Sequence, residues 1–447
     1  MRAALTFVVP FLLPAACAIS PAGEDDERAR SDAAGTAYAK PYGERQLPPL
    51  SAPATLEECV ARAMAGNGDL EQAWFEWRAA LERVPQEGSQ ATTLEIGAGF
   101  EWPGGGRSTF DRTTLTAGTD STAMLEWPGK VADRARAAFL AARAAGYHYL
   151  QLRDELRARV VAAYLEFATL REEIAVRGAQ AQLLAVAAAL AEQRVASGAT
   201  AQAELLRLRT ELDLARDAEA SSRSREPGLR ARLLALLGVD PTTPLDVVVP
   251  EPRPFPYSDA QVFAHFREHN PELAEHALEV EAAQARLDVA RQAWIPELSL
   301  SFDLVGSVSR MVAAGAALPF LRRDALRGLV REAEADLAAL QAYRRQMGST
   351  MAAGVVLELA ALRNAERQIE LFAARLVPRA VQAAALARST YANGRGAFTD
   401  WLDAQRVALD VQLTLVRART ERERSVAELE RYAAHALGHA EPRPPQR

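Results

Sequence analysis

The fold is decided by residues 130–197, KVADRARAAFLAARAAGYHYLQLRDELRARVVAAYLEFATLREEIAVRGAQAQLLAVAAALAEQRVAS. This stretch contains no proline, and its apolar side chains recur at the three- or four-residue spacing of a helix. The residues that set this period are Leu152, Leu156, Val160, Tyr164, Phe167, Leu170 and Ile174. One continuous helix of this length extends roughly 100 Å, far more than a compact globular domain uses. The sequence therefore predicts an elongated, mainly α-helical protein.

Two pairs of short segments have instead the two-residue period of β-strands. In the first half these are residues 94–102 and 113–127, and in the second half residues 298–304 and 312–318. A tilted strand needs about nine residues to cross a bilayer. No uninterrupted apolar run of about 18 residues follows residue 20, so we expect any membrane crossing to be made by these strands.

The chain contains an internal repeat. Ala63–Ala80 (AMAGNGDLEQAWFEWRAA) aligns with Phe266–Ala283 (FREHNPELAEHALEVEAA), and the alignment matches Asn67 with Asn270. In each half a strand pair, a proline, a long helix, a glycine turn and another helix follow in the same order. A period near 200 residues with this order of elements indicates duplication of one structural unit.

Caps and prolines predict the ends of the helices. Thr55 and Glu58 form a capping-box pattern, and we expect Pro85 to lie just past the end of the helix that they start. After the first glycine turn, a helix is predicted to reach about residue 224, with Pro227 at a kink or join. The long helix of the second half is predicted over about 322–391, with a kink at Pro378.

Six segments result from these boundaries. They are a signal peptide (1–16), a lipid-anchored extended linker (17–54), repeat 1 (55–238), a Pro-rich connector (239–258), repeat 2 (259–438) and a disordered tail (439–447). Each repeat is expected to consist of a helix, a β-hairpin and a long helix pair.

The N-terminus has the architecture of a secretory signal. Arg2 precedes an apolar stretch, Ala3 to Leu13, which is too short to span a bilayer. The run LPAAC at 13–17 resembles a bacterial lipobox, in which Cys17 becomes lipidated after cleavage, although Pro14 departs from the usual leucine. In that resemblance the Ala that follows the cysteine favours sorting to the outer membrane. Ordinary cleavage after Ala18 is the alternative.

Charge and motifs exclude several classes of function. The net charge is -6 and no basic block stands out, so a nucleic-acid partner is not expected. Two cysteines, Cys17 and Cys59, are too few for a disulfide framework. The glycine run at 104–106 lacks the Lys-Ser/Thr ending of a phosphate loop. We therefore expect no enzyme activity and no cofactor.

The repeated order of elements resembles the TolC-like outer-membrane efflux proteins, over about residues 55–438. The Asn-x-Asp/Glu-Leu starts at Asn67 and Asn270, Pro128 and Pro319 before the long helices, and YANGRGAFTDWLDAQ at 391–405 carry the resemblance. It implies a mainly α fold with a small transmembrane β-barrel and long antiparallel helices that form a periplasmic α-barrel. It further implies a channel subunit that works with a periplasmic adaptor and an inner-membrane pump. The lipobox is similar to that of the lipidated members, which are anchored in outer-membrane lipid.

Strand number independently favours a homotrimer. Two hairpins give four strands, whereas the smallest transmembrane barrels have about eight. An open sheet edge in lipid leaves backbone donors and acceptors unsatisfied. Three copies give a closed twelve-stranded barrel.

The resemblance places a periplasmic gate at Asp400 and Asp403, which stand three residues apart just after a glycine turn. Three subunits would bring six carboxylates together, and crowded carboxylates repel one another unless they are protonated or cation-bound. The alternative is that one or both cap the N-terminus of their helix.

The two glycine turns form the expected tips of the tunnel, where members of the family meet the adaptor. The residues concerned are Ser197, Gly198, Thr200, Asn393, Gly394 and Gly396. A glycine stop without any partner is the alternative.

Two other classes of protein could account for parts of the sequence. A periplasmic coiled-coil adaptor or scaffold without a pore would have no use for matched strand pairs. A zinc hydrolase could use His265, Glu268 and His269, which fit H-x-x-E-H, with His276 as a third ligand. The first repeat has no such residues in the equivalent places, so the structural unit does not require them and we expect no metal site.

Overall fold

The structure is a computed structural model. It describes residues 18–91, 93–102, 108–119, 125–198, 201–250, 252–305, 309–393 and 395–434. The chain divides into two compact units. Unit 1 comprises Met1–Thr36, Gln72–Tyr149 and Pro271–Gly348, and unit 2 comprises Ala37–Glu71, Leu150–Asn270 and Ser349–Arg447.

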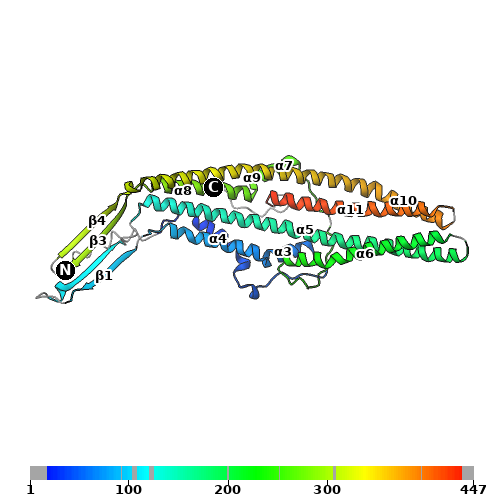
Figure 1. The fold of residues 1–447 in the computed structure, drawn as a ribbon, viewed down its shortest axis with the longest axis horizontal. Helices are drawn as coiled ribbons and strands as arrows, with labels where there is room; N and C mark the ends of the chain where they lie inside the picture. Colours follow the sequence, from blue (N-terminus) through cyan, green and yellow to red (C-terminus); the bar gives the residue numbers. More distant parts are fainter. Residues whose placement is uncertain are drawn as a thin grey trace. The chain divides into compact units, whose positions relative to one another are not determined.

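The order of elements is the same in both halves of the chain (Figure 1). The first half contains α3 (Leu56–Gly66), α4 (Gly68–Glu87), β1 (Leu94–Phe100), β2 (Thr113–Thr119), α5 (Pro128–Ala196) and α6 (Gln202–Leu236). The second half contains α7 (Asp259–His269), α8 (Pro271–Gln292), β3 (Glu297–Val305), β4 (Ser309–Ala317), α9 (Arg323–Leu371), α10 (Val377–Ala392) and α11 (Phe398–Tyr432). The long helix predicted from residues 130–197 is confirmed as α5, with 69 residues.

Each half begins with a capped helix that an asparagine interrupts. Thr55 and Glu58 form the predicted capping box at the start of α3. The expected single helix over 55–84 is, however, two helices, because Asn67 has an extended backbone between α3 and α4. The Asn67 side chain accepts hydrogen bonds from the backbone N–H groups of Asp69 and Leu70 and so caps the second helix. Asn270 occupies the same place between α7 and α8.

Two helices continue through prolines that were expected to interrupt them. Pro85 lies inside α4, not past its end. A proline at this position leaves the carbonyl of Leu81 without its helical donor. The Arg28 guanidinium supplies that donor, at 3.1 Å from the Leu81 oxygen. Likewise, α6 does not stop near residue 224 but runs through Pro227 to Leu236.

The long helix of the second half is interrupted just before Pro378. Between α9 and α10 lies one π-helical turn, η6 (Phe372–Leu376). A π-turn is a common way to absorb a local irregularity in a long helix. The irregularity predicted at Pro378 is therefore present, but it lies at Phe372–Leu376, just before the proline.

The prediction of an extended linker over residues 17–54 is wrong for its first part. Residues Glu24–Ala34 form a helix, α2, followed by the 3-10 turns η2 (Thr36–Tyr38) and η3 (Tyr42–Glu44). Four acidic residues occupy the first turn of α2, where the helix dipole favours them. The indole N–H of Trp74 donates to the Ser31 carbonyl at 2.8 Å and fixes α2 against α4. Composition alone could not indicate this tertiary partner.

The four strands form one antiparallel sheet in the order β1-β2-β3-β4, within unit 1 (Figure 1). The two hairpins are joined by pairing of β2 with β3, which leaves β1 and β4 as edges. The second strand, expected over 113–127, is described as a strand only for Thr113–Thr119, and residues 120–124 lie outside the described part.

Alternation along the strands gives the sheet two unlike faces. The register places mostly apolar residues on one face, with Thr113 and Arg310 as polar exceptions: Ile96, Ala98, Phe100, Leu115, Ala117, Leu298, Leu300, Phe302, Leu304, Val312, Ala314 and Ala316. The opposite face carries mainly small or polar residues, including Glu95, Gly97, Gly99, Thr114, Thr116, Ser299, Ser301 and Asp303. One apolar and one polar face is the pattern of a transmembrane barrel wall.

One helix also has the composition of a membrane span. In the described residues, α5 contains an 18-residue window with a mean hydropathy of 1.5, of which 22% is buried. With 69 residues, α5 is much longer than the roughly 20 residues that a bilayer requires, so its length does not match that of a single span.

Candidate functional site at the helical tips

Two helical hairpins of unit 2 contain the predicted tip residues. The first joins α5 to α6, and the second joins α10 to α11. In the first turn Gly198 has a φ of 74°, the left-handed conformation that commonly ends a helix. In the second turn the backbone N–H groups of Arg395 and Gly396 both donate to the Thr390 carbonyl, at 2.9 and 3.1 Å. The predicted tip residues Thr200 and Gly394 lie outside the described residues.

Turn geometry explains two more of the predicted residues. The Ser197 hydroxyl donates to the Arg194 carbonyl at 3.0 Å, and the Asn393 N–H donates to the Ser389 carbonyl at 3.1 Å. A Cβ atom at Gly396 would lie 2.9 Å from the Thr390 hydroxyl and 3.2 Å from the backbone nitrogen of Tyr391, so a larger residue here would require Thr390 to shift.

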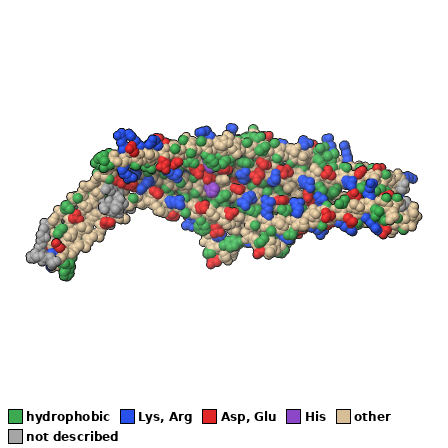
Figure 2. Space-filling view, viewed as in Figure 1, with side chains coloured by type: hydrophobic (Ala, Val, Ile, Leu, Met, Phe, Trp, Pro, Cys, Tyr) green, Lys and Arg blue, Asp and Glu red, His purple; other side chains and the backbone are tan. Residues whose placement is uncertain are grey.

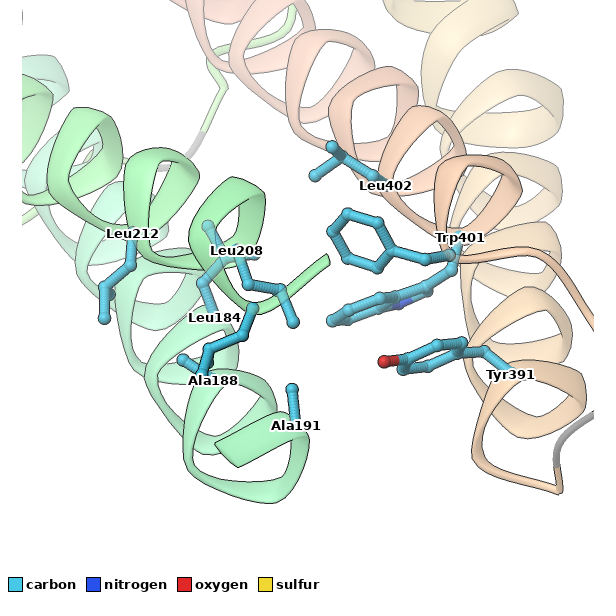
Figure 3. Close-up of a cluster of buried hydrophobic side chains, with 10 residues drawn as sticks. Leu184, Ala188, Ala191, Leu208, Leu212, Tyr391, Trp401 and Leu402 are labelled. Atoms are coloured by element: carbon cyan, nitrogen blue, oxygen red, sulfur yellow. The ribbon is translucent and has the colours of Figure 1, made fainter. Parts of the chain in front are cut away.

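The hairpins are held together by a buried group of side chains, which we call the tip cluster (Figure 3). It consists of Leu184, Ala188, Ala191, Leu205, Leu208, Leu212, Tyr391, Phe398, Trp401 and Leu402. The rings of Tyr391 and Trp401 are stacked, with centroids 5.5 Å apart and an angle of 6° between their planes. Figure 3 shows both rings pointing from the second hairpin toward the aliphatic side chains of the first. Trp401 is only 1% exposed, so the cluster excludes water from this contact.

A polar contact crosses the same interface. The Tyr391 hydroxyl donates a hydrogen bond to the carboxylate of Glu204, in the first turn of α6. Burial, followed by this carboxylate, raises the pKa of Tyr391 to about 12, so the phenol stays a neutral donor at physiological pH. The guanidinium of Arg194 donates to the Tyr391 carbonyl at 3.4 Å and lies 5.5 Å from the ring centroid. Tyr391 therefore links α10 to both helices of the first hairpin.

Asp400 and Asp403 lie at the start of α11, and both are exposed. The alternative that one of them is the N-cap is wrong as regards hydrogen bonding, because the N-cap residue is Ala397 and no side chain caps this helix, but Asp400 does lie in the first turn, where the helix dipole favours an anion. A carboxylate of Asp403 lies 3.7 Å from Arg406, whose guanidinium also pairs with Glu211 of α6. The side chain of Asp403 is 72% exposed, so this pair leaves it accessible to solvent and ions.

The histidines of the H-x-x-E-H motif have other contacts. The rings of His265 and His269 meet edge to face with centroids 5.6 Å apart, and Glu268 is exposed. His276, the suggested third ligand, accepts or donates a 2.7 Å hydrogen bond with Glu279 and packs on the ring of Tyr343. Within the described residues no group of three potential ligands is arranged to hold a metal ion.

The resemblance of residues 391–405 to the family assigned no role to Tyr391 or Trp401. No sequence pattern pointed to Glu204. The internal repeat aligned Asn67 with Asn270 without a reason for the match. The structure supplies one: the Asn67 amide donates to the Leu236 carbonyl at 3.2 Å, and the Asn270 amide to the Tyr432 carbonyl at 2.9 Å. Each asparagine thus holds the last residue of its half's final helix. Cys17 lies outside the described residues.

Comparison with known proteins finds similarity to outer membrane efflux proteins in sequence and to outer-membrane channels in fold. Residues 264–435 match the family model of the outer membrane efflux proteins. CyaE of Bordetella pertussis is 29% identical over 221 residues, which is 45% of this chain and 46% of that protein, so the match spans about half of the relative's length.

Solved channel structures share the fold over most of the chain. The CmeC outer-membrane channel of Campylobacter jejuni superposes with a TM-score of 0.73 at 16% identity, covering 86% of this chain and 87% of that one. The MtrE channel of Neisseria gonorrhoeae, in its open state, gives a TM-score of 0.67 at 18% identity, covering 85% and 88%. Part of the second half therefore matches the family model of the outer membrane efflux proteins, and both halves together share the fold of the solved outer-membrane channels.

Proposed function

We propose that this chain is one subunit of a homotrimeric outer-membrane channel, which passes small molecules or metal ions from a pump and adaptor to the outside. The observation that carries the proposal is the four-stranded sheet. It has one apolar and one polar face, and its strands β1 and β4 are unpaired edges in the described chain. Pairing of β4 with β1 of the next copy would satisfy these edges, and three copies would close a twelve-stranded wall around a polar lumen.

The long antiparallel helices of three copies would form a periplasmic α-barrel. Asp400 and Asp403 are exposed in the isolated chain, so three copies can bring their carboxylates to one constriction. Such a ring attracts cations and resists anions, and its mutual repulsion is relieved by protonation or cation binding. It would act as the periplasmic gate.

The turns of the two hairpins provide the surface for the adaptor. Ser197, Gly198, Thr200, Asn393, Gly394 and Gly396 lie in or beside these turns. Docking there would act on the tip cluster directly, because Tyr391 and Phe398 flank the second turn. Energy would come from the inner-membrane pump, and a lipid on Cys17 would add an anchor in the outer membrane.

The test is single-channel conductance of the full-length protein in planar bilayers, after its oligomeric mass has been measured. We expect a trimer with small, cation-selective currents that increase in Asp400→Ala/Asp403→Ala. The matched control is Asp213→Ala/Asp217→Ala, which removes two exposed carboxylates from α6 and should leave the current unchanged. A stable monomer that does not conduct, even as the gate variant, would contradict the channel and favour a scaffold without a pore.

A further inference from the structure

Large apolar side chains are exposed where the sheet of unit 1 joins its helices. Leu318, directly after β4, is 59% exposed, and Phe320 and Leu321 in the following 3-10 turn η5 (Pro319–Arg322) are 62% and 86% exposed. Trp127, directly before α5, is 46% exposed. We call this group, together with Arg322 and Arg323, the collar. Figure 2 shows hydrophobic and basic side chains next to one another at this end of α9.

The collar continues the apolar face of the sheet. Along β4 the apolar face contains Val312, Ala314 and Ala316, and the two-residue period carries this face on to Leu318. On the other side, Leu125 forms a bridge opposite Leu298, which places Leu125 on the same face, and the next residue of that parity is Trp127. The indole N–H of Trp127 donates to the Pro296 carbonyl at 2.8 Å, so the ring is held in place although it is exposed.

The basic side chains of the collar differ from nearby Lys130 in having no acidic partner among the described residues. Lys130 is neutralised within the chain, because its ammonium lies 2.7 Å from both Glu126 and Glu297. Arg322 and Arg323 are exposed, and in the described part of the chain neither guanidinium has an acidic side chain within ion-pair distance. Two exposed guanidinium groups, without an acidic partner within the described ranges, therefore follow directly in sequence after the exposed Phe320 and Leu321.

We propose that the collar binds the anionic phospholipid headgroups of the membrane leaflet that faces the periplasm, an inference that rests on the proposed outer-membrane channel. A guanidinium presents paired N–H donors that match phosphate oxygens. Tryptophan and phenylalanine side chains at the end of an apolar face suit the boundary between acyl chains and headgroups. The collar thus marks the depth at which the sheet leaves the bilayer and favours phosphatidylglycerol over zwitterionic lipid.

The first test measures how many phosphatidylglycerol and phosphatidylcholine molecules the purified full-length protein retains, by native mass spectrometry over a range of lipid concentrations. We expect wild type to retain phosphatidylglycerol in preference to phosphatidylcholine. In Arg322→Gln/Arg323→Gln this preference should fall about 30-fold, because two basic side chains no longer attract the anionic headgroup. Arg379→Gln/Arg388→Gln, which removes two exposed charges from α10, should retain the wild-type preference. Equal retention of the two lipids by wild type, or equal loss in both variants, overturns the proposal.

The second test asks whether lipid or a neighbouring copy covers the collar. A fluorophore is attached to the cysteine of Leu321→Cys in a Cys59→Ala background. The Cys59→Ala variant alone serves as the blank. Both are placed in vesicles whose lipid headgroups carry a quencher. Quenching in vesicles supports the proposal, and its absence shows that another subunit covers the site and overturns it. The oligomeric mass and the conductance of the same preparations test the proposed channel separately. A conducting trimer without lipid preference would contradict lipid binding at the collar but not the channel.

Discussion

Replacing Tyr391 by phenylalanine should shift the proposed channel toward its open state. The substitution removes one hydroxyl, the donor to Glu204 across the two hairpins, and keeps the ring that stacks on Trp401. A hydrogen bond to a charged acceptor contributes about 1.5 to 3 kcal/mol. If the hairpins separate on opening, the lower figure already changes the ratio of closed to open states about tenfold for each protomer.

The assay is the open probability of single channels in planar bilayers, at constant voltage and salt. Glu204→Gln is the matched variant, because its amide oxygen still accepts a hydrogen bond but carries no charge, so its effect should be smaller. A double-mutant cycle between Tyr391→Phe and Glu204→Gln then isolates the pair. The two changes should be clearly non-additive, since each removes part of one contact.

One result would refute this reasoning. If Tyr391→Phe behaves as wild type while Trp401→Ala opens the channel, the apolar packing of the tip cluster holds the hairpins together and the hydrogen bond does not. Trp401 is 1% exposed, and truncation of such a side chain costs about 3 to 5 kcal/mol, so this variant must first be shown to fold and to form trimers.

Three further predictions concern the supporting structure. Asn270→Ala should lower the free energy of unfolding by about 1 to 3 kcal/mol, measured by urea titration, because the last carbonyl of α11 loses its donor. Gly35→Ala should release α2 and speed its limited proteolysis, because the new Cβ would lie 2.0 Å from the Trp74 ring, an overlap that costs about 2 kcal/mol. The hydrogen bond that the His148 ring donates to the Glu275 carboxylate raises the pKa of His148 above its ordinary value of 6.5. Because the folded pKa is the higher one, the pair stabilises fully below about pH 6.5 and loses its contribution as pH rises through the folded pKa. The melting temperature of wild type should therefore exceed that of Glu275→Gln by more at about pH 6 than at about pH 9.

Patterns among neighbouring residues correctly predicted the helices and strands whose formation depends mainly on those neighbours. The period of apolar residues sufficed for α5, and the Thr55–Glu58 pattern sufficed for the start of α3. Strict alternation located β3, because each of its side chains faces either the apolar or the polar side. These features need no knowledge of distant residues.

Two of the failures involve a partner far away in the chain. Pro85 does not end α4 because Arg28 donates to the carbonyl that the proline leaves free. Residues 24–34 were assigned to a linker because their charge hides the few side chains that α2 buries, and the indole that fixes it is Trp74. No rule about neighbouring residues contains this information.

The candidate site shows the same limit. The segment 391–405 was recognisable by resemblance, yet the function of Tyr391 depends on Glu204, which is 187 residues away. Neither residue belongs to a spacing pattern with the other. Only the fold brings the two turns of the duplicated unit to one place.

Duplication explains why this site exists and also why it had to diverge. Both halves keep an asparagine that holds the end of the final helix, Asn67 on Leu236 and Asn270 on Tyr432, so the supporting contact is the same twice. The tips are not the same, because the first hairpin contributes aliphatic side chains and the second contributes the aromatic ones. Two copies of the first hairpin would offer no ring to insert and no phenol to reach Glu204. The contact therefore requires unlike halves, because the second hairpin supplies the aromatic rings and the first supplies the aliphatic side chains and the Glu204 carboxylate that receive them.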